Sequence, residues 1–166
     1  ADNVEARLDP LTPAERSRQM AKVKAKNSKP ELMVRKLVHG LGFRFRLHAS
    51  DLPGCPDLVF PSRRKAIFVH GCYWHRHEGC SRCRLPKTRL DFWKPKLEAN
   101  RERDLKNQAA LASLGWKCFI VWECQVSKAQ VSSLSLAIVG FLPNGSLLRS
   151  HGQTFSKPAG HNLRQL

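Results

Sequence analysis

The chain has 166 residues, and its 29 Lys and Arg against 13 Asp and Glu give a formal net charge of +16 with histidine neutral. The length suits one domain, and the 42% of hydrophobic residues are enough for a core. So large a basic excess favours a polyanion such as nucleic acid as partner and, with no apolar run long enough to span a bilayer, argues against a membrane protein.

Residues 1–12 are predicted to form a loose arm without the apolar segment of a signal peptide, so we expect an intracellular, cytoplasmic and nucleoid-associated protein. Thr12, Pro13 and Glu15 then form the pattern of a helix start. Ser28-Lys-Pro-Glu31 is a second capping pattern, and the helix that follows it is expected to end at Gly42.

The middle of the chain reads as strands. Residues 43–48 alternate apolar and basic side chains, and residues 57–60 and 65–70 form two further short runs joined by a hairpin loop at 61–64. A polar loop rich in Cys, His and Arg follows over about 71–90.

The last third alternates helix and strand. Asp91 is expected to cap a long helix that ends at Gly115, followed by a buried strand from Cys118 to Glu123 and a last helix from Val126 to Leu142. Helices around a short mixed sheet predict a three-layer α/β/α or α+β domain over 13–142, with a peripheral tail over 143–166.

Cysteine and histidine occur together at ligand spacing. Cys72, His77 and Cys80 form C-x4-H-x2-C, and Cys124 lies just past a predicted strand, so these four predict a closed, structural zinc site. Cys83 is an alternative to Cys80, and His75 an alternative to His77. The competing interpretation, three disulfides in a secreted protein, fits poorly with the charge and the absence of an export signal.

An acid and an imidazole are expected at the open end of the hairpin. If Phe60 faces Lys65, Asp57 faces Phe68 and His70 lies diagonally beyond it on the same side of the sheet. Together they would hold a hydrated metal ion and move a proton. The simpler alternatives are a turn residue after Pro56 and a core histidine.

Two further polar residues interrupt an apolar stripe of the long helix. Leu97, Asp104 and Leu111 are seven residues apart, and Asn100 lies beside them, so a carboxylate is expected to face the core. Glu31, in contrast, is explained by its place at a helix start.

Aromatic residues also occur among cations. Tyr73-Trp74 precedes Arg76, and Phe92-Trp93 follows Lys87 and Arg89, a composition that suits unstacked bases as well as an ordinary core. Phe92 or Trp93 is the better candidate for the core.

Several motifs in this order resemble the very-short-patch repair (Vsr) endonucleases, which nick DNA at T:G mismatches. The matching stretches cover residues 12 to 140: Arg18-Gln-Met20, Pro30-Glu-Leu32, Leu52-Pro-Gly-Cys-Pro-Asp57, Phe68-Val-His-Gly-Cys-Tyr-Trp-His75, Lys87-Thr-Arg-Leu-Asp-Phe-Trp93, Asn100-Arg-Glu-Arg-Asp104, Leu114-Gly-Trp and Val121-Trp-Glu-Cys124. Each is weak alone, and the combination is specific.

The resemblance implies a restriction-endonuclease-like fold and two metals. Asp57 and the carbonyl of Val69 would bind active-site Mg²⁺, and His70 would act on the nucleophilic water. His75, Asp104, Asn100 and Glu31 would surround them, and Cys72, His77, Cys80 and Cys124 would hold structural Zn²⁺.

The DNA contacts implied by the resemblance come from several segments. Tyr73 and Trp74 would wedge beside the mismatch, and Met20 would enter from the other groove. Further contacts are expected from basic side chains, namely Lys22, Lys24, Arg76, Lys87 and Arg89. A monomer is expected, with mismatch-repair proteins or a DNA polymerase as partners.

The sequence departs from the family at four places. Val69 replaces a Thr, which leaves a backbone ligand intact; Cys55 replaces a common Arg and removes a phosphate contact. Tyr73 replaces Phe, and Glu78-Gly79 lengthens the zinc loop. The predicted activity is Mg²⁺-dependent nicking 5′ of the mispaired thymine in duplex DNA. The alternatives are a nuclease with other sites and a zinc-stabilised DNA-binding protein without catalysis.

Overall fold

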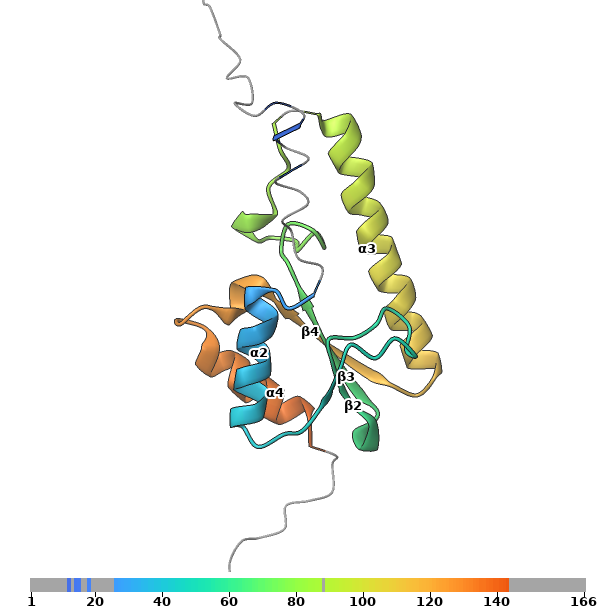
Figure 1. Cartoon of the computed structure of the whole chain (residues 1–166), viewed down its shortest axis with the longest axis vertical. Helices are drawn as coiled ribbons and strands as arrows, with labels where there is room; N and C mark the ends of the chain where they lie inside the picture. The colour runs from blue at the N-terminus through green and yellow to red at the C-terminus, as the bar shows by residue number, and fades with distance from the viewer. Residues whose placement is uncertain (1–11, 13, 16–17, 19–25, 88, 144–166) are drawn as a thin grey trace, which may run out of the picture.

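The computed structural model describes residues 12, 14–15, 18, 26–87 and 89–143. A four-stranded mixed sheet lies between the helices α2 and α4 on one face and α3 on the other (Figure 1). This confirms the three-layer α/β/α prediction. None of the helices in the described residues has the length and apolarity needed to cross a membrane.

The sheet order is β1-β2-β3-β4, with β1 at Arg46–Leu47, β2 at Leu58–Phe60, β3 at Lys65–His70 and β4 at Lys117–Trp122. β2 is antiparallel to both β1 and β3, and β4 is parallel to β3. Phe60 pairs with Lys65 around the short 3-10 turn η1 (Pro61–Arg63), which confirms the predicted hairpin register.

The predicted helix starts are present. Ser28 caps α2 (Lys29–Gly40) in a reciprocal box with Glu31, so the Ser28 hydroxyl and the Glu31 carboxylate each satisfy a backbone N–H. Near the N-terminus the backbone N–H of Glu15 donates to the Thr12 hydroxyl at 3.3 Å.

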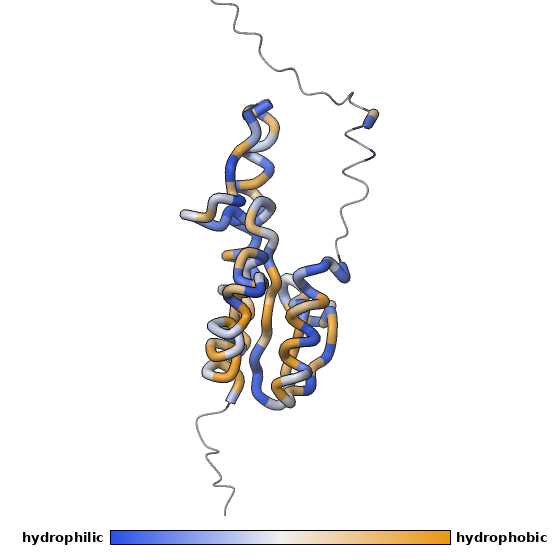
Figure 2. The backbone as a smooth tube through the Cα atoms, turned by 90° about the vertical axis from the view of Figure 1, so that its left-hand side faces the viewer, coloured by the Kyte–Doolittle hydropathy of each residue, from blue (hydrophilic) through white to orange (hydrophobic). Residues whose placement is uncertain are grey.

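Alternation along the strands divides the interior into two layers. Ile67 belongs to a core shared with Val34 of α2 and Ile138 of α4 (Val131–Phe141), whereas Ala66, Phe68 and His70 face α3. Figure 2 shows a largely apolar strand running between the helices. The α3-facing side of the sheet therefore carries the polar end of β3 toward the long helix.

Several predicted elements differ from the structure. Asp91 is not a cap, because α3 (Leu90–Ser113) begins after Arg89, whose φ of 54° turns the chain into the helix, and Asp91 lies in the first turn. Of the strand predicted over 43–48, only Arg46 and Leu47 pair with another strand, and these two residues form β1.

Two predictions near the C-terminal end were also wrong in part. The strand predicted as buried is β4, an edge strand of which Val121 alone is fully buried, and Glu123 belongs to the 3-10 turn η3 (Glu123–Val126). This turn delays the last helix, so α4 begins at Val131 rather than at Val126.

Candidate active site and metal centre

A cavity of about 250 Å³ opens where β2 begins and β3 ends. Asp57, the residue before β2, and His70, the last residue of β3, both line this cavity. The Asp57 Oδ2 accepts a hydrogen bond of 2.7 Å from the backbone N–H of Val69. The carboxylate and the imidazole that the sequence placed at the open end of the hairpin thus line one cavity.

The Asp57 carboxyl group is held in a partly buried and acidic environment. Burial raises its pKa to about 6, the Val69 N–H lowers it, and the negative charge of Glu31 raises it further. The carboxylate is ionised above neutral pH at a cost that a bound cation would offset.

His70 is buried and in contact with a second imidazole. Its ring stacks on that of His75 with centroids 3.9 Å apart and planes within 11°. Burial, with a smaller contribution from His75, lowers the pKa of His70 to about 4, so its ring is neutral at pH 7 and can accept a proton.

His75 is oriented by the long helix. Its Nδ1 lies 2.6 Å from Asp104 Oδ2, so the Nε2 remains free for the cavity. Asp104 reaches the ring because Leu97 and Leu111, at the same stripe of α3, are fully buried. The prediction that a carboxylate faces the core from this stripe is confirmed.

Asn100, one turn before Asp104, donates from Nδ2 to the carbonyl of Trp74 at 3.3 Å. Its Oδ1 accepts from Arg103 at 2.7 Å. The amide therefore ties α3 to the loop that carries Trp74 and His75.

Glu31 lies at the other side of Asp57. It is 3% exposed, and its Oε1 contacts the Arg35 guanidinium and lies 3.2 Å from His48 Nε2. The sequence analysis assigned no role to Arg35 or His48. The i,i+4 spacing of Glu31 and Arg35 was a readable signal for the first contact, but nothing in the sequence pointed to His48.

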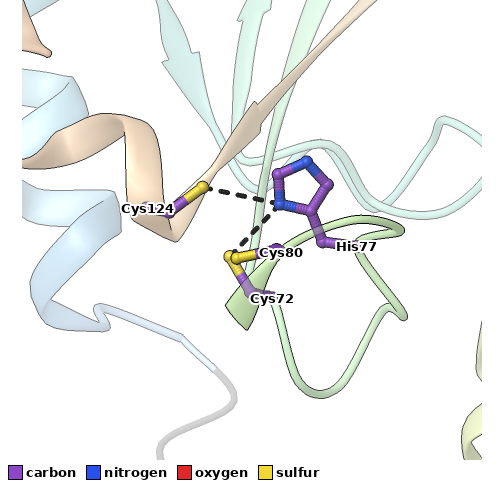
Figure 3. Close-up of side chains that lie close together, drawn as sticks. All are labelled: Cys72, His77, Cys80 and Cys124. Atoms are coloured by element: carbon purple, nitrogen blue, oxygen red, sulfur yellow. Dashed lines mark hydrogen bonds between the residues drawn. The ribbon is translucent and has the colours of Figure 1, made fainter. Parts of the chain in front are cut away.

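A cluster of Cys72, His77, Cys80 and Cys124 joins the loop after β3 to the turn after β4 (Figure 3). His77 Nδ1 is 3.5 Å from the sulfurs of both Cys72 and Cys124, and the four ligand atoms, with that of Cys80, lie within 4.8 Å of one another. The His77 ring stacks on Trp122 at 4.2 Å with the planes 1° apart.

The two alternatives for this cluster lie elsewhere. The Cys83 sulfur and carbonyl both face the Arg76 guanidinium, at 3.6 and 3.2 Å, and His75 pairs with Asp104. The structure thus brings together the set Cys72, His77, Cys80 and Cys124. Arg76, expected at the DNA, is held within its own loop.

The aromatic residues of the loop and of α3 form one group. The ring centroids of Tyr73 and Trp74 are 5.1 Å apart, and each lies 6.2 Å from the ring centroid of Trp93. Trp93 is buried at 6% exposure, whereas Phe92 is 43% exposed and carries Arg89 over its ring at 4.9 Å. Of the two core candidates, Trp93 is the one that is buried.

A second, larger groove of about 1070 Å³ adjoins the cavity between the start of α2 and the first half of α3, and Asp57, Val69 and His75 line both. Four cations line the groove, namely Lys29, Lys36, Lys96 and Arg103. Lys87 and Arg89 are exposed near the start of α3. Met20, Lys22 and Lys24 lie outside the described residues.

Known proteins resemble this chain over much of its length. The family model of the DNA mismatch endonuclease Vsr matches residues 8–82. A Type II nicking enzyme, V.XorIIP of Xanthomonas oryzae pv. oryzae, is 56% identical over 119 residues, covering 72% of this chain and 87% of the relative. The DNA mismatch endonuclease Vsr of Escherichia coli K12 is 40% identical over 111 residues, 67% of this chain and 70% of the relative. V.HpaIIP of Haemophilus parainfluenzae is 39% identical over 122 residues, which cover 73% of this chain and 86% of the relative.

The fold, the cavity and these relatives define the chain as a DNA endonuclease, an enzyme whose substrate is DNA. It belongs to the Vsr family.

Proposed function

We propose that this endonuclease nicks duplex DNA on the 5′ side of the mispaired thymine in T:G mismatches, which arise from deamination of 5-methylcytosine, by Mg²⁺-dependent hydrolysis. The observation that carries the proposal is the convergence of Asp57, Val69 and His70 on one cavity beside a groove that four cations line.

The donors around Asp57 suit magnesium. Mg²⁺ prefers oxygen ligands, and the Asp57 carboxylate offers one at the cavity wall. The N–H and C=O groups of one strand residue point to the same side of the strand. The Val69 carbonyl therefore points to the side on which its N–H donates to Asp57. When bound there, Mg²⁺ would neutralise charge on the scissile phosphate and acidify a water.

The protein groups then divide the proton transfers. Neutral His70 takes the proton of the attacking water, whose oxygen bonds to phosphorus as the P–O bond of the leaving strand breaks, and the freed oxygen takes a proton from solvent water. Asp104 keeps His75 in one orientation, with Nε2 toward the reacting groups. The Asn100 amide holds the carbonyl of Trp74, and the Glu31 carboxylate caps α2 and places a negative charge near Asp57.

The cluster of Cys72, His77, Cys80 and Cys124 suits a structural zinc. Tetrahedral zinc, with sulfur at about 2.3 Å and nitrogen at about 2.0 Å, separates these two atoms by about 3.5 Å. Both measured sulfur–nitrogen distances are 3.5 Å. Four protein donors leave no position for a substrate, so the role is to hold the loop.

Mismatch recognition is assigned to the same loop. Tyr73 and Trp74 lie directly between the zinc ligands Cys72 and His77, and a mispaired base step is cheaper to unstack than a matched one. One relative is named a DNA mismatch endonuclease, which supports this specificity.

The test compares Asp57→Ala with the wild-type protein on a labelled T:G duplex. We expect nicking to fall by about a thousandfold or more while the T:G duplex is still bound, because the variant loses the main metal ligand. Asp51→Ala, which removes an exposed carboxylate in the same segment, is the matched control and should nick normally. Equal nicking by the Asp57 variant and the wild type would rule out the proposed site.

A nuclease with other sites is a second candidate, because several relatives are named Type II nicking enzymes rather than mismatch endonucleases. Equal cutting of T:A or C:G duplexes would favour it.

A further inference from the structure

The Glu31 carboxylate is a buried charge whose two oxygens are both engaged. Oε2 accepts the backbone N–H of Ser28 at 3.3 Å, and Oε1 accepts from the Arg35 Nη2. A capping box needs only the first of these contacts. The second contact pairs the carboxylate with a guanidinium that has no part in the roles proposed above.

Arg35 joins Glu31 to His48. Its Nη2 lies 2.8 Å from His48 Nε2, and since a guanidinium can only donate, the same nitrogen serves both Glu31 and this ring nitrogen. The Arg35 side chain is 14% exposed, and its Nε is buried without a hydrogen-bond partner among the described residues. Such an arrangement is a poor source of stability, because burying the charges costs about as much as pairing them returns.

His48 links this pair to Asp57. Its backbone N–H donates to the carbonyl of Asp57 at 3.3 Å, and its side chain lines the same cavity. The backbone of His48 has φ of 46°, a left-handed conformation that non-glycine residues seldom adopt. Strain of this kind persists where the surrounding structure requires it and is enriched at functional sites.

The three groups meet within a short distance. One ligand atom from each of Glu31, His48 and Asp57 lies within 4.8 Å of the other two. Two carboxylates this close repel each other, so Glu31 would turn away from Asp57 unless a cation held it. The Arg35 guanidinium is that cation, and His48 keeps it against both Glu31 and the segment that carries Asp57.

We propose that Arg35 and His48 are positioning residues of the nicking reaction, which hold the Glu31 carboxylate at a fixed place beside Asp57. This inference rests on the proposed function of Asp57. The two residues act through Glu31 and Asp57 and touch neither the scissile phosphate nor the water, so they set the rate of the chemical step and leave DNA affinity unchanged.

The experiment measures single-turnover nicking and T:G duplex affinity for Arg35→Met, Glu31→Gln and the double variant, at saturating Mg²⁺. Arg35→Met is expected to slow nicking by about tenfold or more, with the dissociation constant within about twofold of wild type. Because Arg35 acts through Glu31, the double variant should be no slower than Glu31→Gln alone. Arg35→Lys, which keeps a cation within reach of Glu31, should recover part of the rate.

Two further variants keep the test decisive. Asn tolerates the left-handed conformation, so His48→Asn removes the imidazole without straining the backbone and should also slow nicking, again without adding to Glu31→Gln. It replaces Arg35→Met if that variant does not fold. Arg63→Met, which removes an arginine packed on Phe43 at the far end of the hairpin, should nick at the wild-type rate.

Wild-type rates in folded Arg35→Met or His48→Asn, or slowing that multiplies with that of Glu31→Gln, would overturn the positioning role. A nicking-competent Asp57→Ala would instead overturn the proposed function. The two failures are therefore distinct.

Discussion

At the scale of single residues, the buried position of Asp57 suits metal binding but lowers the stability of the folded protein when the carboxyl group is ionised. Burial and the neighbouring Glu31 raise the pKa of this carboxyl group to about 6, so its ionised form is disfavoured in the folded protein. Because the folded-state pKa lies above the unfolded value of 3.8, the proton binds the folded state more tightly. The stability that the protonated carboxyl contributes is present at low pH and is lost as the pH rises through about 6.

Asp57→Asn is therefore expected to stabilise the protein while abolishing nicking. At pH 8, in zinc-loaded protein without Mg²⁺, urea unfolding should show a gain on the order of 1–3 kcal/mol, because the neutral amide avoids the buried charge. At pH 5.5 most of the wild-type carboxyl is protonated, and the gain should shrink. Asp51→Asn should change neither value, and a variant less stable than wild type at pH 8 would refute this view of Asp57.

At the scale of elements, the loop after β3 is organised by a Cys and His cluster that could hold a metal ion. Tyr73, Trp74 and His75 lie between Cys72 and His77, and Cys124 ties the loop to the turn after β4. Burial raises the pKa of the Cys72 thiol to about 12, so a bound cation is what would keep this sulfur as thiolate. Orientation of the aromatic pair and of His75 therefore depends on the cluster.

The choice between Cys80 and Cys83 can be measured as zinc content. Cys80→Ser should lose zinc, lower the melting temperature and weaken both nicking and the preference for a mismatch, because the loop that carries Trp74 and His75 loses an anchor. Cys83→Ser should keep one zinc per chain, since this thiol lies outside the cluster and faces Arg76. Zinc loss in the Cys83 variant with retention in the Cys80 variant would reverse the assignment.

The elements that could be predicted from the sequence are those fixed by local rules. The Ser28–Glu31 box, the four-residue turn that pairs Phe60 with Lys65 and the stripe of α3 with Asp104 depend on short spacing alone. Burial of β4 could not be predicted, because an apolar run does not reveal that its strand lies at the edge of the sheet.

The same distinction holds for the site. The position of Asp57 and His70 on one side of the sheet could be predicted from the hairpin register, and the inward position of Asp104 from the helical period. His48 was missed because its role depends on a left-handed backbone and on Arg35, 13 residues away in another element. Long-range contacts of this kind leave no periodic signal.

At the scale of the whole molecule, the net charge is +16, and four of the cations, Lys29, Lys36, Lys96 and Arg103, line the groove beside the cavity. If six cations, from the groove and the start of α3, each neutralise a phosphate, log K for DNA should fall against log salt with a slope of about −5. Lys36→Gln, in the groove, should reduce the magnitude of this slope by about 1. Lys117→Gln, at the far end of β4, should leave it unchanged, and equal effects of the two variants would place the DNA elsewhere.

We propose that this enzyme cuts one strand beside a T:G mismatch. The most direct measurement is digestion of end-labelled T:G, T:A and C:G duplexes with Mg²⁺ and varied flanking bases, with the cut mapped on a sequencing gel. We expect a single nick, 5′ of the mispaired thymine, in the T:G duplex and intact T:A and C:G duplexes. Cutting of the matched duplexes at the same rate, or a nick in the guanine strand, would contradict it.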